Sequence, residues 1–430
     1  MRKLRQLRGQ IMKNFDISIS NIYKLLYGRV LTNIGDSIIL ISLTWYVATQ
    51  YHNTFYLGLI GVIVGIIDIL MIFIGPILDR YNTVKILYLS TFLQIIIVIG
   101  MTLLFYFNIV HLIGLFLLLS VSLVCSSVIY PAENVLIPKI SKSKDEIMKH
   151  NSLFQVTYKG MDIVLDGMVG VILSVIMIQT LFTINIVIFV AAFFMFKLLK
   201  LKSSNVNQDD QKNKPNPTFF EDYIQDLKGG LRYVAHKTIL KLLIPLSIVN
   251  FAISAVAVVY PKMAVAQGHD SINYGLMLFI NGLGMIVGFL IGPGIIKRLN
   301  FSHLLFVSFV CLGLVWLVIF VISPNYFLIT LGLLFISNLF IGIINLTFIN
   351  AFQILPPEHM LGRVATTNET LLSLLMPLGA FIGGILPNLF ETINVNFILL
   401  SFMSMVIAVF YLLDKDMREI KSLNHMEIES

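Results

Sequence analysis

The chain has 430 residues, of which 57% are hydrophobic and only 12% are charged. Soluble domains carry about 25% charged residues, so this composition excludes an ordinary soluble protein. Apolar runs of about 20 residues recur along the chain, and each is long enough to cross a bilayer as a helix. We therefore expect an all-α integral membrane protein, because helices satisfy their own backbone groups in lipid.

Twelve apolar runs are expected to form transmembrane helices. They cover residues 22–50, 55–78, 85–107, 111–130, 152–178, 181–200, 239–261, 272–295, 303–323, 326–350, 365–388 and 393–413. Between the sixth and seventh runs the chain becomes polar and contains prolines, which is typical of a flexible linker. Apolar side chains at helical spacing then predict a short amphipathic helix before the seventh run.

This pattern predicts two halves joined through a polar connection. Residues 1–200 would form an N-terminal six-helix half, and residues 239–430 a C-terminal six-helix half with a cytoplasmic tail. Residues 201–238 would form the cytoplasmic linker with its amphipathic helix.

The second and eighth runs contain an internal repeat. Leu57-Gly58-Leu59 and Ile74-Gly75-Pro76 in the first copy match Tyr274-Gly275-Leu276 and Ile291-Gly292-Pro293 in the second, always 217 residues later. This offset is about half the chain, so the two halves are expected to share one structure. In transporters, such halves move against each other around a central site.

The formal net charge of +7 has an explanation other than nucleic-acid binding. If the N-terminus is cytoplasmic, Lys262 alone among the 30 Lys and Arg residues lies on the outer side. This distribution follows the positive-inside rule for membrane proteins. We therefore expect a multi-pass protein of the cell (cytoplasmic) membrane, with both termini cytoplasmic and no nucleic-acid partner.

Enzymatic and metal-binding motifs are not found in the sequence. There is no nucleophile triad or phosphate-binding glycine loop, and Cys125 and Cys311 lie in opposite halves without metal-ligand spacing. We expect no enzyme activity, no cofactor and no bound metal. The expected partners are a small-molecule substrate, protons and membrane lipid, and the chain is expected to act as a monomer.

Carboxylates inside the spans of the N-terminal half are the first candidate site residues. A lone ionised carboxylate costs several kcal/mol there, so it should be paired, protonated or facing water. Asp36 lies seven residues after Arg29, on the same helix face, and either a bond to Arg29 or backbone or a transport role would explain it. Asp68 and Asp166 have no basic residue one turn away, which favours a role in proton coupling.

The C-terminal half has amides in place of these carboxylates. They are Asn250, Asn281, Asn338 and Asn345. Such amides could bind a polar group of a substrate, or link helices at about 0.6 kcal/mol each. The linking role is favoured, and Asn250 and Asn345 remain candidate substrate contacts.

The end of the second run resembles the signature of the major facilitator superfamily. It reads Gly75-Pro76-Ile77-Leu78-Asp79-Arg80, and Lys85 follows five residues later as the remaining cation of the motif. The resemblance implies that Asp79 bonds to the start of span 11 and to nearby basic residues. Gly75, Asp79, Arg80, Lys85, Gly362 and Arg363 would then form a cytoplasmic latch between the halves. A plain surface Asp-Arg turn is the alternative.

Three further stretches resemble drug exporters of this superfamily, including macrolide efflux proteins. Pro131-Ala132-Glu133-Asn134 resembles their loop after span 4, residues 226–233 their helix before span 7, and Leu361-Gly362-Arg363-Val364 their loop between spans 10 and 11. Two stretches depart from the pattern. Span 4 lacks the arginine of many proton-coupled exporters, and span 5 has Leu165-Asp166-Gly167 where the antiporter signature usually ends in Gly-Pro.

The resemblance implies the major facilitator fold, with twelve transmembrane helices in two six-helix halves. It also implies efflux of amphipathic, cationic, macrolide-type compounds by proton antiport with alternating access, and hence a role in drug resistance. Spans 1, 4, 7 and 10 would line the site. The alternatives are an exporter of an endogenous metabolite or siderophore, and a non-transporting membrane receptor or scaffold.

Overall fold

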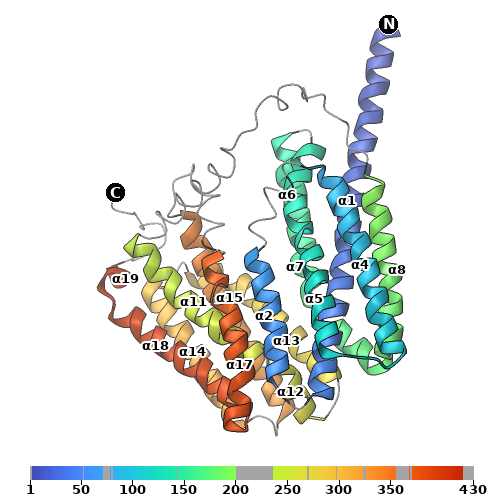
Figure 1. Ribbon diagram of the computed structural model, residues 1–430. Coiled ribbons are helices and arrows are strands. Elements are labelled where there is room, and N and C mark those ends of the chain that lie inside the picture. Colours follow the sequence, from blue (N-terminus) through green and yellow to red (C-terminus); the bar gives the residue numbers. More distant parts are fainter. Residues whose placement is uncertain are drawn as a thin grey trace, which may run out of the picture. The chain divides into compact units, whose positions relative to one another are not determined.

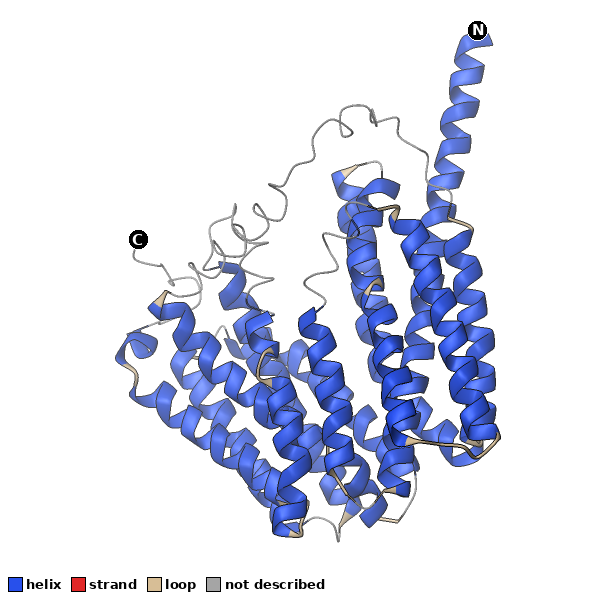
Figure 2. Ribbon diagram, viewed as in Figure 1, coloured by secondary structure: helices blue, strands red, loops and turns tan. Residues whose placement is uncertain are grey.

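A computed structural model describes residues 2–199 and 236–419, apart from gaps at 52, 71–77, 79–80, 142, 269–270, 297, 323–325, 355–367 and 369. Every regular element in these ranges is a helix (Figure 2). The predicted all-α membrane fold is therefore confirmed. The predicted linker and amphipathic helix lie outside the described residues.

The helices follow the predicted spans closely (Figure 1). In the first part of the chain they are α1 (Arg2–Gln50), α2 (Phe55–Leu70), α4 (Thr83–Tyr106), α5 (Leu112–Ser127), α6 (Ile129–Ile140), α7 (Lys144–Val175) and α8 (Ile178–Lys197). In the second part they are α11 (Lys237–Ala257), α12 (Tyr260–Ala266), α13 (Ser271–Ile296), α14 (Phe301–Ile322), α15 (Phe327–Ile354), α17 (Met376–Phe390), α18 (Val395–Leu413) and α19 (Lys415–Glu419).

Ten segments of the described chain are long and apolar enough to cross a membrane. The other two predicted spans correspond to α2, which has 16 described residues, and to α7, which begins with a charged turn.

Capping side chains define the first residues of two helices. The Asn82 side chain accepts a hydrogen bond from the Lys85 backbone N–H at 3.0 Å, and Ser143 does the same for Glu146 at 3.2 Å.

Span 4 differs from its prediction. The expected loop after residue 130 is instead helix α6, which continues to Ile140, so span 4 covers Leu112–Ile140. The helix is interrupted at Val128, between α5 and α6. Pro131 explains the interruption because it has no N–H to donate to the carbonyl of Ser127, four residues earlier.

The internal repeat extends to two pairs of packed helices. α4 packs against α8, and α14 packs against α18. The second pair begins 217 or 218 residues after the first, in agreement with the offset between the glycine motifs. The two halves therefore use equivalent helix pairs, as the repeat predicted.

The chain forms two compact units. The first contains residues 1–43 and 70–208, and the second contains residues 44–69 and 209–430. The end of α1 and the described part of α2 thus group with the second unit. The domain boundaries predicted from the polar linker stay a prediction.

Lys262 attaches the end of α1 to α12 within the second unit. Its Nζ donates to the backbone carbonyls of Ala48 at 2.5 Å and Tyr51 at 2.6 Å. A cation is favourable here because the last carbonyls of a helix have no intrahelical partner and carry partial negative charge. The Trp45 ring adds a stacked contact with Tyr274, with 6.1 Å between ring centroids.

Glycines allow two pairs of helices in the second unit to touch. A Cβ on Gly58 of α2 would lie 2.8 Å from the Ala380 carbonyl oxygen of α17 and 2.9 Å from the Gly384 Cα. A Cβ on Gly284 of α13 would overlap the carbonyl oxygen of Phe335 in α15. Gly58 and Gly284 therefore provide close helix packing.

A break in span 11 is supported by side chains from α11. Residues 374–375 form a turn before α17, and Pro377 cannot donate to the carbonyl of Ser373. Ser247 and Asn250 donate to the carbonyls of Leu371 and Leu372, each at 3.3 Å, and Ser254 donates to that of Met376 at 2.8 Å. These bonds satisfy backbone groups that lipid could not satisfy.

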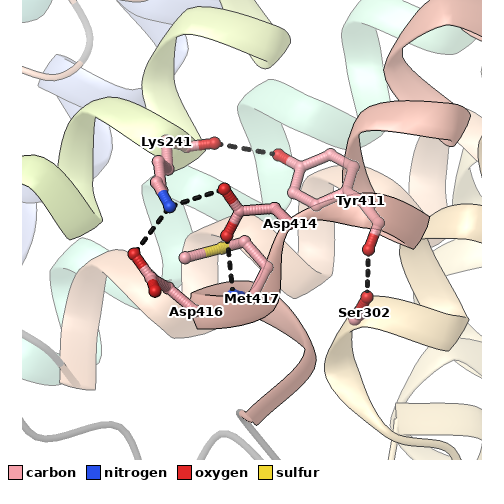
Figure 3. Close-up of polar contacts among 6 residues, drawn as sticks. All are labelled: Lys241, Ser302, Tyr411, Asp414, Asp416 and Met417. Carbon is pink, nitrogen blue, oxygen red and sulfur yellow. Dashed lines mark hydrogen bonds and ion pairs between the residues drawn. The ribbon is translucent and has the colours of Figure 1, made fainter.

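A polar contact at the start of α11 joins this helix to the end of α18 and to α19 (Figure 3). Lys241 Nζ lies 2.5 Å from Asp414 and 2.6 Å from Asp416. Tyr411 donates its hydroxyl to the Lys241 carbonyl at 3.4 Å, and Ser302 of α14 donates to the Tyr411 carbonyl. The charges are partly exposed, so they position α19 more than they stabilise the fold.

Gly383 gives a test of the packing. In Gly383→Ala, the new Cβ would overlap the backbone of Ala255 in α11, so we expect a lower thermal midpoint in detergent, by roughly 5 °C. Gly332→Ala in α15 is the matched control, because its Cβ would meet nothing within 4 Å. Equal midpoints for the two variants would contradict the described α11–α17 contact.

Candidate functional site

Five polar side chains from four helices lie inside the first unit and contact one another in two groups. They are Arg29 and Asp36 of α1, Gln94 of α4, Ser126 of α5 and Glu133 of α6. We call these five residues the polar cluster. Arg29, Gln94 and Glu133 are buried, whereas Asp36 and Ser126 are half-buried. Asp36 and Ser126 are therefore the two residues of the cluster that keep some exposure.

Asp36 is held by two neutral donors. Gln94 donates its Nε2–H to Oδ1 at 2.9 Å, and the Ser126 hydroxyl donates to Oδ2. Both carboxylate oxygens thus have a hydrogen-bond partner, although neither partner brings a positive charge. The sequence allowed a bond between Asp36 and Arg29. Among the described residues, no hydrogen bond or ion pair joins these two side chains.

Arg29 pairs instead with Glu133. Its Nε lies 3.3 Å from Glu133 Oε1, and both side chains are nearly inaccessible. The guanidinium also lies over the Tyr158 ring, 4.6 Å from its centroid. An ion pair so deeply buried has lost its hydration, and removing one partner alone would leave an uncompensated charge.

The Arg29–Glu133 ion pair and the Asp36–Ser126 hydrogen bond, which we call the two rungs, both join α1 to the antiparallel span 4. Arg29 and Asp36 are two turns apart on α1, and their partners Glu133 and Ser126 are seven residues apart in the opposite direction. The rungs are therefore separated by about 10 Å along the helix axis. The interruption at Val128 lies between them.

Sequence reasoning missed Glu133 because we assigned it to a loop motif. One signal was present: its spacing from Ser126 equals the spacing of Arg29 from Asp36. Beyond the Arg29 rung, both helices contribute to one apolar cluster, which includes Ile22, Leu25, Ile137 and Ile140. This packing fixes the register that brings Glu133 to Arg29.

The second half of the chain does not repeat the polar cluster. The positions 217 residues after Arg29, Asp36, Gln94 and Glu133 are Leu246, Ile253, Cys311 and Asn350. The second half therefore forms its equivalent helices without charged residues at these four positions. Burying the charged groups of the cluster costs desolvation free energy, and the second half has no charged residues at the equivalent positions. This difference favours a functional role for the cluster.

The charges of the polar cluster do not balance when all three groups are ionised. Asp36 and Glu133 carry two negative charges, and Arg29 carries one positive charge. The cluster therefore has one uncompensated negative charge in surroundings that solvate charge poorly. A proton or a monovalent cation would neutralise it.

The sequence model of the Major Facilitator Superfamily matches residues 25–380. The chain belongs to this superfamily. The match includes all five residues of the polar cluster and the predicted signature after span 2. The superfamily consists of transporters, which agrees with the expectation that the chain is not an enzyme.

Solved structures of superfamily transporters share this fold. A bacterial homologue of the iron transporter ferroportin in an inward-facing state has a TM-score of 0.67 and 14% identity, covering 92% of this chain and 99% of its own. A bacterial homologue of the lysosomal transporter Spinster gives 0.67 and 13%, with 94% and 98% coverage. The D-xylose–proton symporter gives 0.62 and 11%, with 93% and 97% coverage.

These identities show the fold alone, and the proteins transport different substrates. No curated relative matches the sequence. The resemblance to drug exporters of the superfamily is therefore supported only as far as the superfamily itself. The choice of substrate must be argued from the residues of this chain.

The remaining predicted site residues do not join the polar cluster. Asp68 is exposed on α2, in the second unit. Asn250 donates to the Leu372 carbonyl and so links two helices. Asn338 donates to Asn281 at 2.7 Å, which links α15 to α13. Asn345 is half-buried on α15.

Several residues of the predicted latch and coupling site lie outside the described residues. They are Gly75, Asp79, Arg80, Gly362, Arg363 and the side chain of Asp166. Lys85 is described, and it is exposed in the first turn of α4. The latch and the role of Asp166 stay predictions.

The buried ion pair predicts a specific pattern of stability. Arg29→Met should lower the free energy of unfolding by about 3 kcal/mol, because Glu133 loses its only charged partner in the cluster. The double variant Arg29→Met/Glu133→Leu should recover most of that loss, because it removes both charges and keeps the volume filled. Thermal unfolding in detergent measures both. A single variant as stable as the wild type would contradict the pairing.

Proposed function

We propose that this protein is a secondary active transporter that exports amphipathic, cationic compounds in exchange for protons by alternating access. Macrolide-type amines are among the compounds proposed from the sequence. The observation that carries the proposal is that the polar cluster holds two carboxylates and a single cationic side chain. The cluster lies in the first unit, and Asp36, which has two neutral donors as partners, is a half-buried residue.

Asp36 is proposed to receive the positive charge of the substrate. A cation that approaches Asp36 gains an electrostatic contact in a medium of low dielectric constant, where such contacts are strong. The apolar side chains of the surrounding spans suit the rest of an amphipathic molecule. Intramembrane carboxylates commonly mark substrate or proton pathways, which supports the same assignment.

A proton would compete with the substrate for the same charge, and this competition is the proposed basis of exchange. When the proton binds, the cluster becomes neutral and the attraction for a cation is lost. Asp68 and Asp166 remain proposed proton carriers because each lies in a span without a basic residue one turn away. Asn250 and Asn345 are proposed to contact the substrate from the second unit.

The position in the cell is also part of the proposal. The distribution of Lys and Arg favours the cell membrane with both termini cytoplasmic. In this orientation, Gly75, Asp79, Arg80, Lys85, Gly362 and Arg363 would form a cytoplasmic latch. The working form is proposed to be a monomer in contact with lipid.

Cysteine labelling tests this orientation. In a background with Cys125→Ser and Cys311→Ser, His111→Cys lies between α4 and α5, and Asp145→Cys lies at the start of α7. We expect an impermeant maleimide added to whole cells to label position 111 and to spare position 145. Everted vesicles should give the opposite pattern. Labelling of position 145 on whole cells would contradict cytoplasmic termini.

Transport by variants tests the function. Asp36→Asn should weaken binding of cationic compounds about tenfold or more, because a charge-assisted contact is lost, and should change binding of neutral compounds little. At least one of Asp68→Asn and Asp166→Asn should abolish uphill export while binding remains measurable.

The measurements are proton release and substrate uptake in everted vesicles, with binding assayed in detergent. Vesicles with wild-type protein should release protons when a cationic substrate is added. If none of a broad set of amines causes proton release, the antiporter proposal fails, and export of a metabolite or siderophore or a non-transporting role becomes the better reading. If all three variants export like the wild type, the carboxylates are structural.

A further inference from the structure

One amide oxygen of the polar cluster has neither a hydrogen bond nor an ion pair among the described residues. Arg29 Nε and Glu133 Oε1 also lack a hydrogen bond, but they form the ion pair described above. Gln94 is fully buried, and its Nε2–H donates to Asp36, yet among the described residues no group donates to its Oε1. A buried carbonyl oxygen without a hydrogen bond is costly, and such groups are uncommon in folded proteins. An acceptor is therefore free directly beside the carboxylate proposed to bind cations.

The orientation of this amide follows from electrostatics. If the amide were turned over, Oε1 would point at the carboxylate oxygen of Asp36, and two acceptors would face each other. The carboxylate therefore holds the NH2 group toward itself and leaves Oε1 as the unused acceptor. Ser126 does not use it, because its hydroxyl donates to Asp36 Oδ2.

The two acceptors are close enough for one nitrogen to contact both. Nε2 lies 2.9 Å from Asp36 Oδ1, and Oε1 belongs to the same amide group, so the two oxygens are within about 5 Å of each other. A single nitrogen that donates to both would lie about 2.8 Å from each oxygen. It would approach from the side of Asp36 and Ser126, which are half-buried, with Gln94 behind them.

We propose that Asp36 and Gln94 form a binding site for an ammonium group that carries at least two N–H donors. One N–H would donate to the Asp36 carboxylate and the other to Gln94 Oε1. This inference rests on the proposed function and narrows its substrate class to primary and secondary amines. It makes Gln94 a specificity-determining residue.

The number of donors separates the classes of amine. A protonated primary amine has three N–H groups, a secondary amine two, a tertiary amine one, and a quaternary ammonium none. A tertiary amine can satisfy Asp36 but leaves Gln94 Oε1 without a partner. Sites that hydrogen-bond a substrate group reject analogues that lack it, because a buried polar atom is then left unpaired. A macrolide-type tertiary amine would thus bind less tightly than a primary amine of similar size.

A matched series of ligands tests the proposal. The series places NH2, NHCH3, N(CH3)2 and N(CH3)3 groups on one aryl-alkyl chain, at a pH where every ionisable member is protonated. Binding to the purified full chain in detergent and counterflow in proteoliposomes are both measured. We expect the primary and secondary amines to bind equally within about threefold, and the tertiary amine about tenfold more weakly.

A variant assigns the preference to Gln94. Gln94→Met keeps a similar volume and removes the amide, so the primary amine should lose its advantage over the tertiary amine. The readout is the ratio of the two affinities, which is insensitive to the fraction of active protein. Asn185→Leu is the matched control. Asn185 is another buried amide whose oxygen has no hydrogen-bond partner in the described part of the chain, and its Nδ2–H donates to the Gly35 carbonyl of α1 at 3.1 Å. The control should keep the wild-type ratio.

The outcomes separate this inference from the proposed function. If all four ligands bind equally, or affinity rises with methylation, the inference is overturned while cation export stands. If Gln94→Met keeps the preference, the assignment to Gln94 is overturned. If no cation binds, the proposed function fails instead. Should Gln94→Met not fold, the series on the wild-type protein still decides whether two donors are required.

Discussion

The constraint on which this structure depends is that lipid offers no hydrogen bonds. Backbone groups must then be satisfied inside the protein, and every regular element in the described ranges is accordingly a helix. Where helices are interrupted, side chains of other elements supply the missing partners. Ser247, Asn250 and Ser254 do so at the break in span 11, and Lys262 does so at the end of α1.

The same requirement makes the polar cluster informative. Arg29 offsets one of two carboxylates, and Gln94 and Ser126 donate to the other. One negative charge and one amide oxygen remain without a counterpart, and both belong to one small region of the first unit. The equivalent positions of the second half hold no charged residue, so the repeat itself does not require this arrangement. Charge balance and hydrogen bonding both support the proposal of a cationic donor at this place.

Conformational change is compatible with the way the helices pack. The contacts of α2 with α17 and of α13 with α15 include glycines that pack directly against backbone atoms of the partner helix. Polar links such as those of Lys262 to the end of α1 are few and directional, and they can be broken and remade. The interruption of span 4 at Val128 lies between the two rungs, so the helix is not continuous there.

Apolar runs of bilayer length were enough to predict an all-helical membrane fold from the sequence, because lipid requires such spans to be helical, and the 217-residue repeat added the expectation of two similar halves. The sequence also singled out Asp36, since a carboxylate in an apolar run is visible without a structure. It did not decide which groups contact each other. Arg29 pairs with Glu133 and Asp36 with Gln94 because of the register between packed helices, and this register depends on side-chain packing across helices far apart in sequence. For the same reason, the helical state of residues 131–140 and the free oxygen of Gln94 emerged only from the tertiary structure.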